Sequence, residues 1–280
     1  MLAQEACLNV WWDFLKAPLG IRFPKPRRQG VNMLLDKGLG LGETRDLLHK
    51  AAHHIDFIKL AFGTSALYSQ ELLEEKIQLV RNYGVNIYPG GTFLEIAIWQ
   101  NRLLEFLKRA YQLGFNFIEV SDGTIFLPAE VREKAINLAL EQGFQVLTEV
   151  GKKDHEQQPC IEKIAELINT DLSLGAHMVI MEGREMGINV GLYDEKGNIR
   201  RGDLERLLEY IAEPDRIIWE APQKGQQQAL INRLGCNVNL GNIPPEEIIA
   251  LEALRLGLRA DTLKTALNDS EYSPYSGHKS

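Results

Sequence analysis

Apolar segments that end in charged residues recur along this chain, and segments with helical character separate them. Eight apolar segments are predicted as strands, at residues 31–36, 57–62, 85–88, 117–120, 144–150, 178–181, 216–219 and 237–240. Predicted helices follow them, at residues 44–52, 70–82, 97–113, 129–142, 161–174, 204–212, 226–233 and 245–256. Several of these helices are followed by glycine, which readily adopts the left-handed conformation that often ends a helix. These glycines are Gly84, Gly114, Gly143, Gly175 and Gly235. This alternation predicts βα units and a parallel sheet.

Eight βα units in one block favour an α/β fold of the (β/α)8 TIM barrel type, formed by a single domain. The sequence shows no internal repeat and no interdomain linker. We expect residues 31–267 to form the barrel, and residues 1–30, which proline interrupts, to form an N-terminal extension. Residues 268–280 are rich in Ser, Tyr and Pro and are predicted to be disordered.

The composition narrows the classes of partner. The 280 residues carry a formal net charge of −7, which argues against a nucleic-acid partner but is compatible with a locally positive pocket for small anions. Cys7, Cys160 and Cys236 are scattered and form no CxxC motif, as expected for reduced thiols in a cytoplasmic protein. No apolar run approaches the ~18 residues that span a membrane, and no signal peptide is evident, so we expect no membrane partner.

Alternation along each strand predicts which side chains face the barrel interior. In the second strand, Ile58, Leu60 and Phe62 share one face and are expected to pack against the helices. Lys59 then points inward. By the same reasoning Glu119 points inward from the fourth strand, and Glu220 shares a side with Ile218 in the seventh.

The carboxyl ends of the predicted strands carry charges of both signs. They comprise Asp36, Lys37, Lys59, Glu119, Asp122, Glu149, Lys152, Lys153, Glu182, Arg184 and Glu220. Charges inside a barrel are costly unless they pair with each other, with a metal or with a charged ligand. One interpretation is an ion-pair network that closes the barrel. The other is an active site, which this fold places at that end.

The residue types at this end indicate a chemistry. Carboxylates without a histidine or cysteine cluster favour a hard ion such as Mg2+. The lysines and Arg184 favour an anionic substrate. Glycines in the loops, such as Gly90 and Gly91, offer backbone N–H groups to a phosphate, and Asn242 follows the last strand where barrels often bind phosphate.

Seven segments together resemble the phosphosulfolactate synthase family, which includes plant heat-stress-associated relatives. They are residues 35–38 (LDKG), Lys59 with 62–65 (FGTS), 88–92 (YPGGT), 119–123 (EVSDG), 147–153 (LTEVGKK), 182–185 (EGRE) and 220–224 (EAPQK). The resemblance runs in order from about residue 31 to residue 263. It implies a Mg2+-dependent barrel enzyme, a lyase that adds sulfite to phosphoenolpyruvate and gives 2-phospho-3-sulfolactate, towards coenzyme M or sulfolactate.

The family's proposed catalytic lysine falls on Lys153, which we expect to act as the general acid. The resemblance and the charges together give further expectations for individual residues. Lys152, Lys59 and Arg184 are expected to assist Lys153 as catalytic cations. Substrate binding is expected from Lys37, Glu119, Asp122, Gly90, Gly91 and Asn242. Metal binding is expected from Glu149, Glu182, Asp36 and Glu220.

Two other functions remain open at this point. One is a non-catalytic, stress-related homologue that keeps the barrel. The other is a different Mg2+-dependent barrel enzyme that acts on a phosphorylated enol or keto acid. In all cases we expect a homo-oligomer, because barrels commonly assemble.

Overall fold

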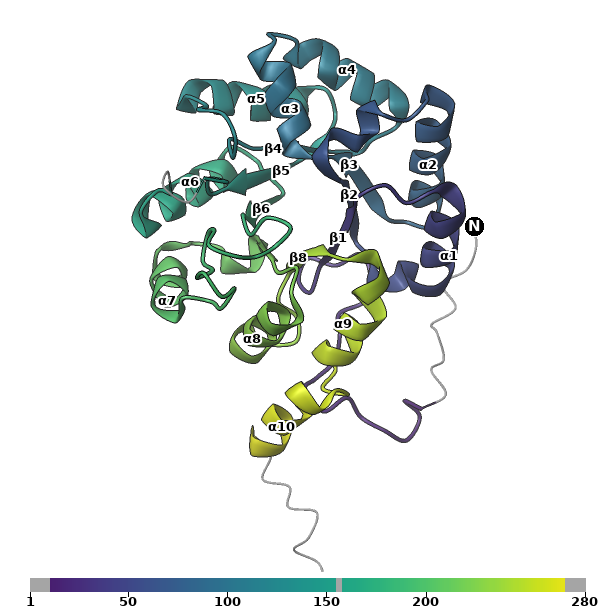
Figure 1. Cartoon of the computed structure of the whole chain (residues 1–280), viewed down its shortest axis with the longest axis vertical. Coiled ribbons are helices and arrows are strands. Elements are labelled where there is room, and N and C mark those ends of the chain that lie inside the picture. Colours follow the sequence, from purple (N-terminus) through teal and green to yellow (C-terminus); the bar gives the residue numbers. More distant parts are fainter. Residues whose placement is uncertain (1–10, 155–157, 270–280) are drawn as a thin grey trace, which may run out of the picture.

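The computed structural model describes residues 11–154 and 158–269, and these residues form a single (β/α)8 barrel (Figure 1). The eight described strands are β1 (Asn32–Asp36), β2 (Phe57–Leu60), β3 (Asn86–Pro89), β4 (Phe117–Val120), β5 (Gln145–Val150), β6 (Met178–Met181), β7 (Ile217–Glu220) and β8 (Leu240–Ile243). They pair in parallel in the order β3-β2-β1-β8-β7-β6-β5-β4. The predicted fold class is therefore confirmed.

Helices surround this sheet on its outer side (Figure 1). They are α1 (Leu41–Ala51), α2 (Gln70–Asn82), α3 (Gly91–Trp99), α4 (Leu103–Leu113), α5 (Ala129–Glu141), α6 (Ile161–Ser173), α7 (Arg201–Tyr210), α8 (Lys224–Leu234), α9 (Ile248–Arg255) and α10 (Ala260–Asp269). Local signals account for their ends. The Ser69 side chain caps α2 by accepting a hydrogen bond from the backbone N of Leu72, and Gly114 ends α4 with φ of 94°.

Two predictions on the first half of the chain are wrong. The strand predicted to reach Phe62 ends at Leu60, because the chain turns into the 3-10 segment η2 (Ala61–Ala66) with Phe62 at φ 55°. Phe62 is 61% exposed and does not pack against the helices. The helix predicted over residues 97–113 is two helices, α3 and α4, because Asn101 breaks it with φ of 56°.

The last predicted strand begins three residues late in the structure, at Leu240. The side chain of Asn239 explains the shift, since its Oδ1 accepts from Val31 N at 3.0 Å and its Nδ2 donates to Ile217 O at 3.0 Å. An asparagine side chain thus takes the place of ladder hydrogen bonds there. Helix α10 was not predicted and includes residues 268 and 269. The rest of the predicted disordered tail lies outside the described residues.

The barrel is nearly closed. Among the described strands, β3 and β4 are neighbours without a backbone ladder. Asparagine side chains bridge this seam instead. Asn116 Oδ1 accepts from Ile87 N at 3.1 Å, and Asn116 Nδ2 donates to Asn86 Oδ1 at 2.7 Å.

Two apolar layers confirm the predicted facing of side chains. Ile58, Leu60 and Ile118 belong to the core between sheet and helices, while the smaller core inside the barrel contains Ile218. The inner core is otherwise formed by Val31, Met33, Phe57, Tyr88, Phe117, Leu147, Met178 and Ile180. Lys59, Glu119 and Glu220 therefore point into the barrel, above this apolar layer.

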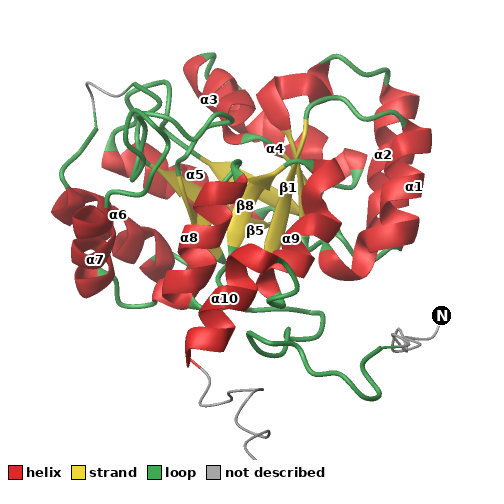
Figure 2. Ribbon diagram, turned by 60° about the horizontal axis from the view of Figure 1, so that its bottom comes forward, coloured by secondary structure: helices red, strands yellow, loops and turns green. Residues whose placement is uncertain are grey.

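Residues 18–30 cross the N-terminal end of the barrel, where α10 also lies (Figure 2). Arg22 is the main anchor, since its Nε lies 2.9 Å from Glu252 Oε2 of α9. Lys25 donates to the backbone oxygens of Ala52, Ile55 and Gly84. Within the described part of the chain, no helix has the length and apolar character needed to span a membrane.

Candidate active site

A cavity of about 360 Å3 opens at the carboxyl ends of the strands. The structure brings nine of the predicted site residues to its wall: Lys59, Gly90, Gly91, Glu149, Lys153, Glu182, Arg184, Glu220 and Asn242. They come from β2, β3, β5, β6, β7 and β8 and the segments that follow these strands. Residues far apart in sequence thus meet at one mouth of the barrel, which we call the active-site cavity.

Lys59 lies at the floor of the active-site cavity, surrounded by carboxylates. Its Nζ is 3.0 Å from Glu119 Oε2, 2.9 Å from Glu149 Oε2 and 3.4 Å from Glu220 Oε1. Burial disfavours the charged ammonium, but the surrounding carboxylates outweigh that effect, so the pKa of Lys59 lies well above its ordinary value. Lys59 is therefore a fixed cation that links β2 to β4, β5 and β7.

Three buried carboxylates, which we call the carboxylate trio (Glu149, Glu182 and Glu220), place one oxygen each within 4.8 Å of the others. Burial alone would raise the pKa of Glu149, but Lys59 and Lys153 lower it to about 2. Burial and the negative charges of Glu149 and Glu220 raise the pKa of Glu182 well above its ordinary value. Burial also raises the pKa of Glu220. The three carboxylates thus repel one another, and the pKa values of two of them rise, so a cation that binds all three would be favoured.

The donor set of the trio fits a hard divalent cation. Glu220 Oε2 accepts from Gly183 N at 2.9 Å, and Glu182 Oε1 accepts from Arg184 N at 2.6 Å, so backbone donors orient two of the carboxylates. Glu149 Oε1 and Glu182 Oε2 are buried and take no hydrogen bond from the described residues. Buried carboxylate oxygens without donors are costly, and Mg2+ is bound through such oxygens.

Glu119 joins the floor of the cavity to α3. Its Oε1 accepts from Gly91 N at 2.7 Å, the first residue of that helix. A Cβ at Gly91 would collide with the side chains of Ser121 and Glu119, so glycine is required for this approach. Burial raises the pKa of Glu119 to about 7, although Lys59 opposes the shift. Glu119 therefore positions the helix start beside the cavity.

Lys153 projects into the cavity with a protonated ammonium. Its Nζ donates to Thr92 Oγ1 at 2.7 Å and lies 3.9 Å from Glu149 Oε1. Burial lowers the pKa of Lys153, but Glu149 and Glu182 outweigh burial and raise it above the ordinary value. The stem of Lys153 passes Gly123, where a Cβ would lie 3.2 Å from its Cε.

Arg184 and Asn242 form a further part of the cavity wall. Arg184 is exposed, has φ of 56°, and donates from a guanidinium nitrogen to Lys153 O at 3.4 Å. Asn242 also has positive φ, of 54°, and donates from Nδ2 to Arg184 O at 3.1 Å. Its Oδ1 is buried without a hydrogen bond from the described residues. Both residues hold left-handed conformations, which cost energy and often mark functional sites.

Lys152 and Asp122 do not line the active-site cavity. Lys152 Nζ lies 2.7 Å from Asp122 Oδ2 and donates to Asp122 O at 2.5 Å, so it ties the loop after β4 to the loop after β5. Arg132 lies 3.4 Å from Asp122 on the other side. Gly151, at φ of 109°, precedes the two adjacent lysines, whose ammonium groups reach Asp122 and Thr92 respectively.

Asp36 and Lys37 also lie apart from the carboxylate trio. Asp36 Oδ1 accepts from Gly38 N and Leu39 N at 2.8 Å each, and Oδ2 lies 2.5 Å from Lys76 Nζ. Both oxygens of Asp36 thus hold the turn after β1. Lys37 pairs with Glu185 at 3.0 Å at the exposed rim.

Two residues of the site went unrecognised in the sequence. Thr92 orients Lys153, although a threonine after two glycines gave no specific signal. Glu95 is buried in α3 and accepts from Ser121 Oγ at 2.5 Å and from the backbone of Thr124 and Ile125. The position of Glu95 within the apolar sequence of α3 could have indicated a buried carboxylate, and a buried charge needs hydrogen-bond or ionic partners.

The sequence profile of the (2R)-phospho-3-sulfolactate synthase (ComA) family matches residues 21–261. The chain belongs to this family. Phosphosulfolactate synthase of Methanothermobacter thermautotrophicus is 46% identical over 254 residues, which cover 90% of this chain and 97% of the relative. The Bacillus subtilis phosphosulfolactate synthase is 39% identical over 247 residues, covering 87% of this chain and 96% of the relative. The protein is thus an enzyme of the phosphosulfolactate synthase type.

Solved structures agree on the fold of this phosphosulfolactate synthase family member. The 3-hexulose-6-phosphate synthase of Salmonella typhimurium superimposes with a TM-score of 0.51 at 15% identity, over 86% of this chain and all of that one (100%). A dihydrodipicolinate synthase (DHDPS) from Cyanidioschyzon merolae gives 0.51 at 13% identity, over 85% of this chain and 79% of that one. At these identities the likeness concerns the barrel alone.

Proposed function

We propose that this protein adds sulfite to phosphoenolpyruvate and forms (2R)-phospho-3-sulfolactate. The observation that carries the proposal is the ammonium of Lys153, which Thr92 holds at 2.7 Å beside the carboxylate trio. A proton donor therefore lies next to a group of oxygens suited to Mg2+, inside a cavity that suits a small anion. Membership of the phosphosulfolactate synthase family supports this reaction.

The proposed reaction needs one carbon–sulfur bond and one proton. The lone pair of the sulfite sulfur forms the bond to C3, and the π electrons between C2 and C3 move onto C2 and the adjacent carboxylate. Lys153 then donates a proton from Nζ to C2 and regains one from solvent. A positioned general acid of this kind typically accelerates a reaction about 10²–10⁴-fold.

The carboxylate trio is the proposed Mg2+ site. Bound Mg2+ would stabilise the negative charge that develops on the substrate carboxylate, as a Lewis acid does. Glu149 and Glu182 each offer an oxygen without a hydrogen bond from the described residues, and Glu220 is oriented by Gly183. We leave Asp36 out of the proposed site, because Lys76 and the backbone of the turn already engage its oxygens.

The other anionic groups of the two proposed substrates also need positive charges or hydrogen-bond donors in the cavity wall. We assign Arg184 to one of them, since its guanidinium is exposed at the cavity wall and offers a two-pronged fork for a carboxylate or phosphate. The start of α3 at Gly90 and Gly91 lines the same cavity, but we assign it no phosphate contact, because Gly90 N donates to Leu60 O and Gly91 N donates to Glu119 Oε1. Asn242 supplies a further polar wall.

Incubation of the purified protein with phosphoenolpyruvate, sulfite and Mg2+, followed by mass spectrometry, tests the proposal. We expect the adduct with the wild type, and a rate about a thousandfold lower with Lys153→Ala. Lys152→Ala is the matched control, because its ammonium faces Asp122 rather than the cavity. A folded wild-type protein that makes no adduct would contradict the reaction and favour a non-catalytic homologue or a different Mg2+-dependent barrel enzyme. Full activity of Lys153→Ala would remove the general-acid assignment.

The sequence also leads us to propose a cytoplasmic homo-oligomer, from the scattered reduced cysteines and the tendency of barrels to assemble. Light scattering of the purified chain would measure its assembly directly.

A further inference from the structure

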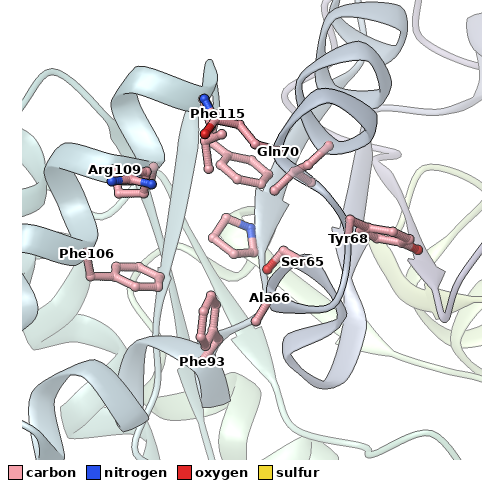
Figure 3. A pocket seen from close by; sticks show the side chains of 12 residues that line it. Ser65, Ala66, Tyr68, Gln70, Phe93, Phe106, Arg109 and Phe115 are labelled. Atoms are coloured by element: carbon pink, nitrogen blue, oxygen red, sulfur yellow. The ribbon is translucent and has the colours of Figure 1, made fainter.

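A second cavity, of about 270 Å3, lies between α2 and α4, outside the active-site cavity (Figure 3). Its walls are mainly apolar and include Pro89, Phe93, Phe106, Leu113 and Phe115. We call it the seam cavity, because Pro89 ends β3 and Phe115 precedes β4, the neighbouring strands that share no backbone ladder in the described chain. The cavity thus forms where the barrel is least tightly closed.

The arrangement of the helices explains why this space is not filled. Two helices, α3 and α4, follow β3 in place of the single helix expected in a βα unit. Phe93 of α3 meets Phe106 of α4 edge to face, with ring centroids 5.2 Å apart. This contact closes one end of the seam cavity but leaves the space between α2 and α4 open, as Figure 3 shows.

Ser65 and Arg109 are two polar residues of the seam cavity whose side chains are available to a ligand. Ser65 is only 6% exposed, and its Oγ makes no hydrogen bond with the described residues. Figure 3 shows this hydroxyl directed into the space enclosed by the aromatic side chains. Arg109 lines the same cavity from α4, is exposed, and forms no ion pair with a described residue. A buried hydroxyl without a partner is costly, so a ligand that accepts its hydrogen bond would be favoured.

We propose that the seam cavity is an effector site for a small organic anion, a monocarboxylate with an aromatic or branched apolar body. The apolar body would occupy the space among the phenylalanines. The carboxylate would accept from Ser65 Oγ and from the guanidinium of Arg109, a donor whose planar fork matches a carboxylate. At about 270 Å3 the seam cavity is slightly smaller than most ligand pockets, but it has their mainly apolar lining with a few polar groups, which suits a small ligand.

Shared walls connect the seam cavity to the active-site cavity. Phe93 lines both, and it follows Thr92, which holds Lys153. Ser65 belongs to η2, whose residues Phe62 and Gly63 line the active-site cavity. A ligand that orders these two segments should tighten substrate binding, and linkage then requires that substrate tighten the effector equally.

The experiment measures binding of 3-phenylpropionate to the whole protein by titration calorimetry. We expect Arg109→Ala to weaken binding about tenfold, the usual consequence of losing a hydrogen bond to a charged group. Ser65→Ala should weaken it several-fold. Lys108→Ala, which removes the neighbouring cation of α4, is the matched control and should bind as the wild type does. The neutral analogue 3-phenylpropanol should bind about tenfold more weakly than the carboxylate.

No binding to the wild type, or equal losses in Arg109→Ala and Lys108→Ala, would overturn the effector site. The coupling rests on the proposed function, because phosphoenolpyruvate is the ligand used to fill the active-site cavity. With phosphoenolpyruvate and Mg2+ present, 3-phenylpropionate should bind at least several-fold more tightly. Unchanged affinity in a protein that makes the adduct would refute the coupling. If no adduct forms, the binding data still decide the effector site.

Discussion

Buried charges lie at both ends of the barrel, and the two groups differ in how completely they are paired. At the N-terminal end, Arg22, Asn32, Glu252 and Arg255 form what we call the lower network. Glu252 accepts from Arg22 and from Asn32, while Arg255 donates to Asn32 and to backbone oxygens. At the carboxyl end, oxygens of Glu149, Glu182 and Asn242 accept nothing from the described residues.

The pKa values of Glu252 and Glu119 show the same contrast, whereas the pKa of Glu149, which the nearby lysines lower to about 2, resembles that of Glu252. Burial alone would raise the pKa of Glu252, but Arg22 and Arg255 lower it to about 2, so the lower network keeps its carboxylate charged. In the active-site cavity, burial outweighs Lys59 and raises the pKa of Glu119 to about 7. In the lower network the charges pair with one another and stabilise the fold. In the carboxylate trio the carboxylates outnumber the nearby lysines, so a bound cation would be favoured. Four predictions test this difference.

The largest expected effect on stability comes from the lower network. Arg255→Met should destabilise the fold by about 3–5 kcal/mol, because it leaves Glu252 with one cation fewer and several backbone oxygens without a donor. Urea unfolding measures the change. Arg184→Met, at the exposed rim of the active-site cavity, is the control and should change stability by no more than about 0.5 kcal/mol. If both variants lost the same free energy of unfolding, the proposed difference between the lower network and the active-site cavity would be wrong.

The contributions of Glu252 and Glu119 to stability should respond to pH in opposite senses. Glu252 has a pKa below its unfolded value, so its stabilisation is present above the unfolded pKa and is lost as the pH falls towards 2. Glu119 has a pKa raised to about 7, so its stability contribution is present below the unfolded pKa and is lost as the pH rises through 7. Each effect is on the order of 3 kcal/mol.

Unfolding of the wild type, Glu252→Gln and Glu119→Gln between pH 3 and pH 8 measures both contributions. For each variant, the free energy of unfolding is subtracted from that of the wild type and plotted against pH. The two difference curves should have slopes of opposite sign. Slopes of the same sign would mean that the two carboxylates share one kind of environment, contrary to the structure.

Mg2+ should stabilise the carboxyl end alone. A concentration about a hundredfold above the dissociation constant adds about 2.7 kcal/mol to the free energy of unfolding, and a chelator removes it. Glu182→Gln should lose this response, since it takes a carboxylate from the trio. Glu252→Gln should keep it. Calorimetric unfolding with and without Mg2+ gives the answer, and a full response in Glu182→Gln would argue against the proposed metal site.

The smallest expected effect concerns orientation within the active-site cavity. Thr92→Val removes the hydroxyl that accepts from Lys153 Nζ and should lower the rate of adduct formation about tenfold, with stability nearly unchanged. Thr170→Val, on the exposed face of α6, is the matched control. A pure structural role for Thr92 would lower the melting temperature and leave the rate per folded molecule as it is.

Much of the fold was predictable because its signals are local. Strand alternation placed Lys59, Glu119 and Glu220 inside the barrel, and the inner core confirms it. One error arose where a distant contact overrides local preference: Asn239 moved the start of β8 by bonding to Val31, just before β1. Another arose from a single backbone break, at Asn101, which divided a helix that looked continuous. The hydrogen bonds of one asparagine side chain and the positive φ of another leave no trace in the hydrophobic periodicity from which strands and helices are predicted.

The sequence by itself determined the eight βα units, the set of charged residues at one mouth and the family, because periodicity and motifs are properties of neighbouring residues. Tertiary structure decided which of these charges meet. Lys152 and Lys153 are adjacent and chemically identical, yet in the folded barrel one reaches Asp122 after β4 and the other reaches Thr92 of α3. The seam cavity likewise follows from the way α3 and α4 pack over β3 and β4. Distances across a closed barrel depend on all its strands at once, so no single segment encodes them.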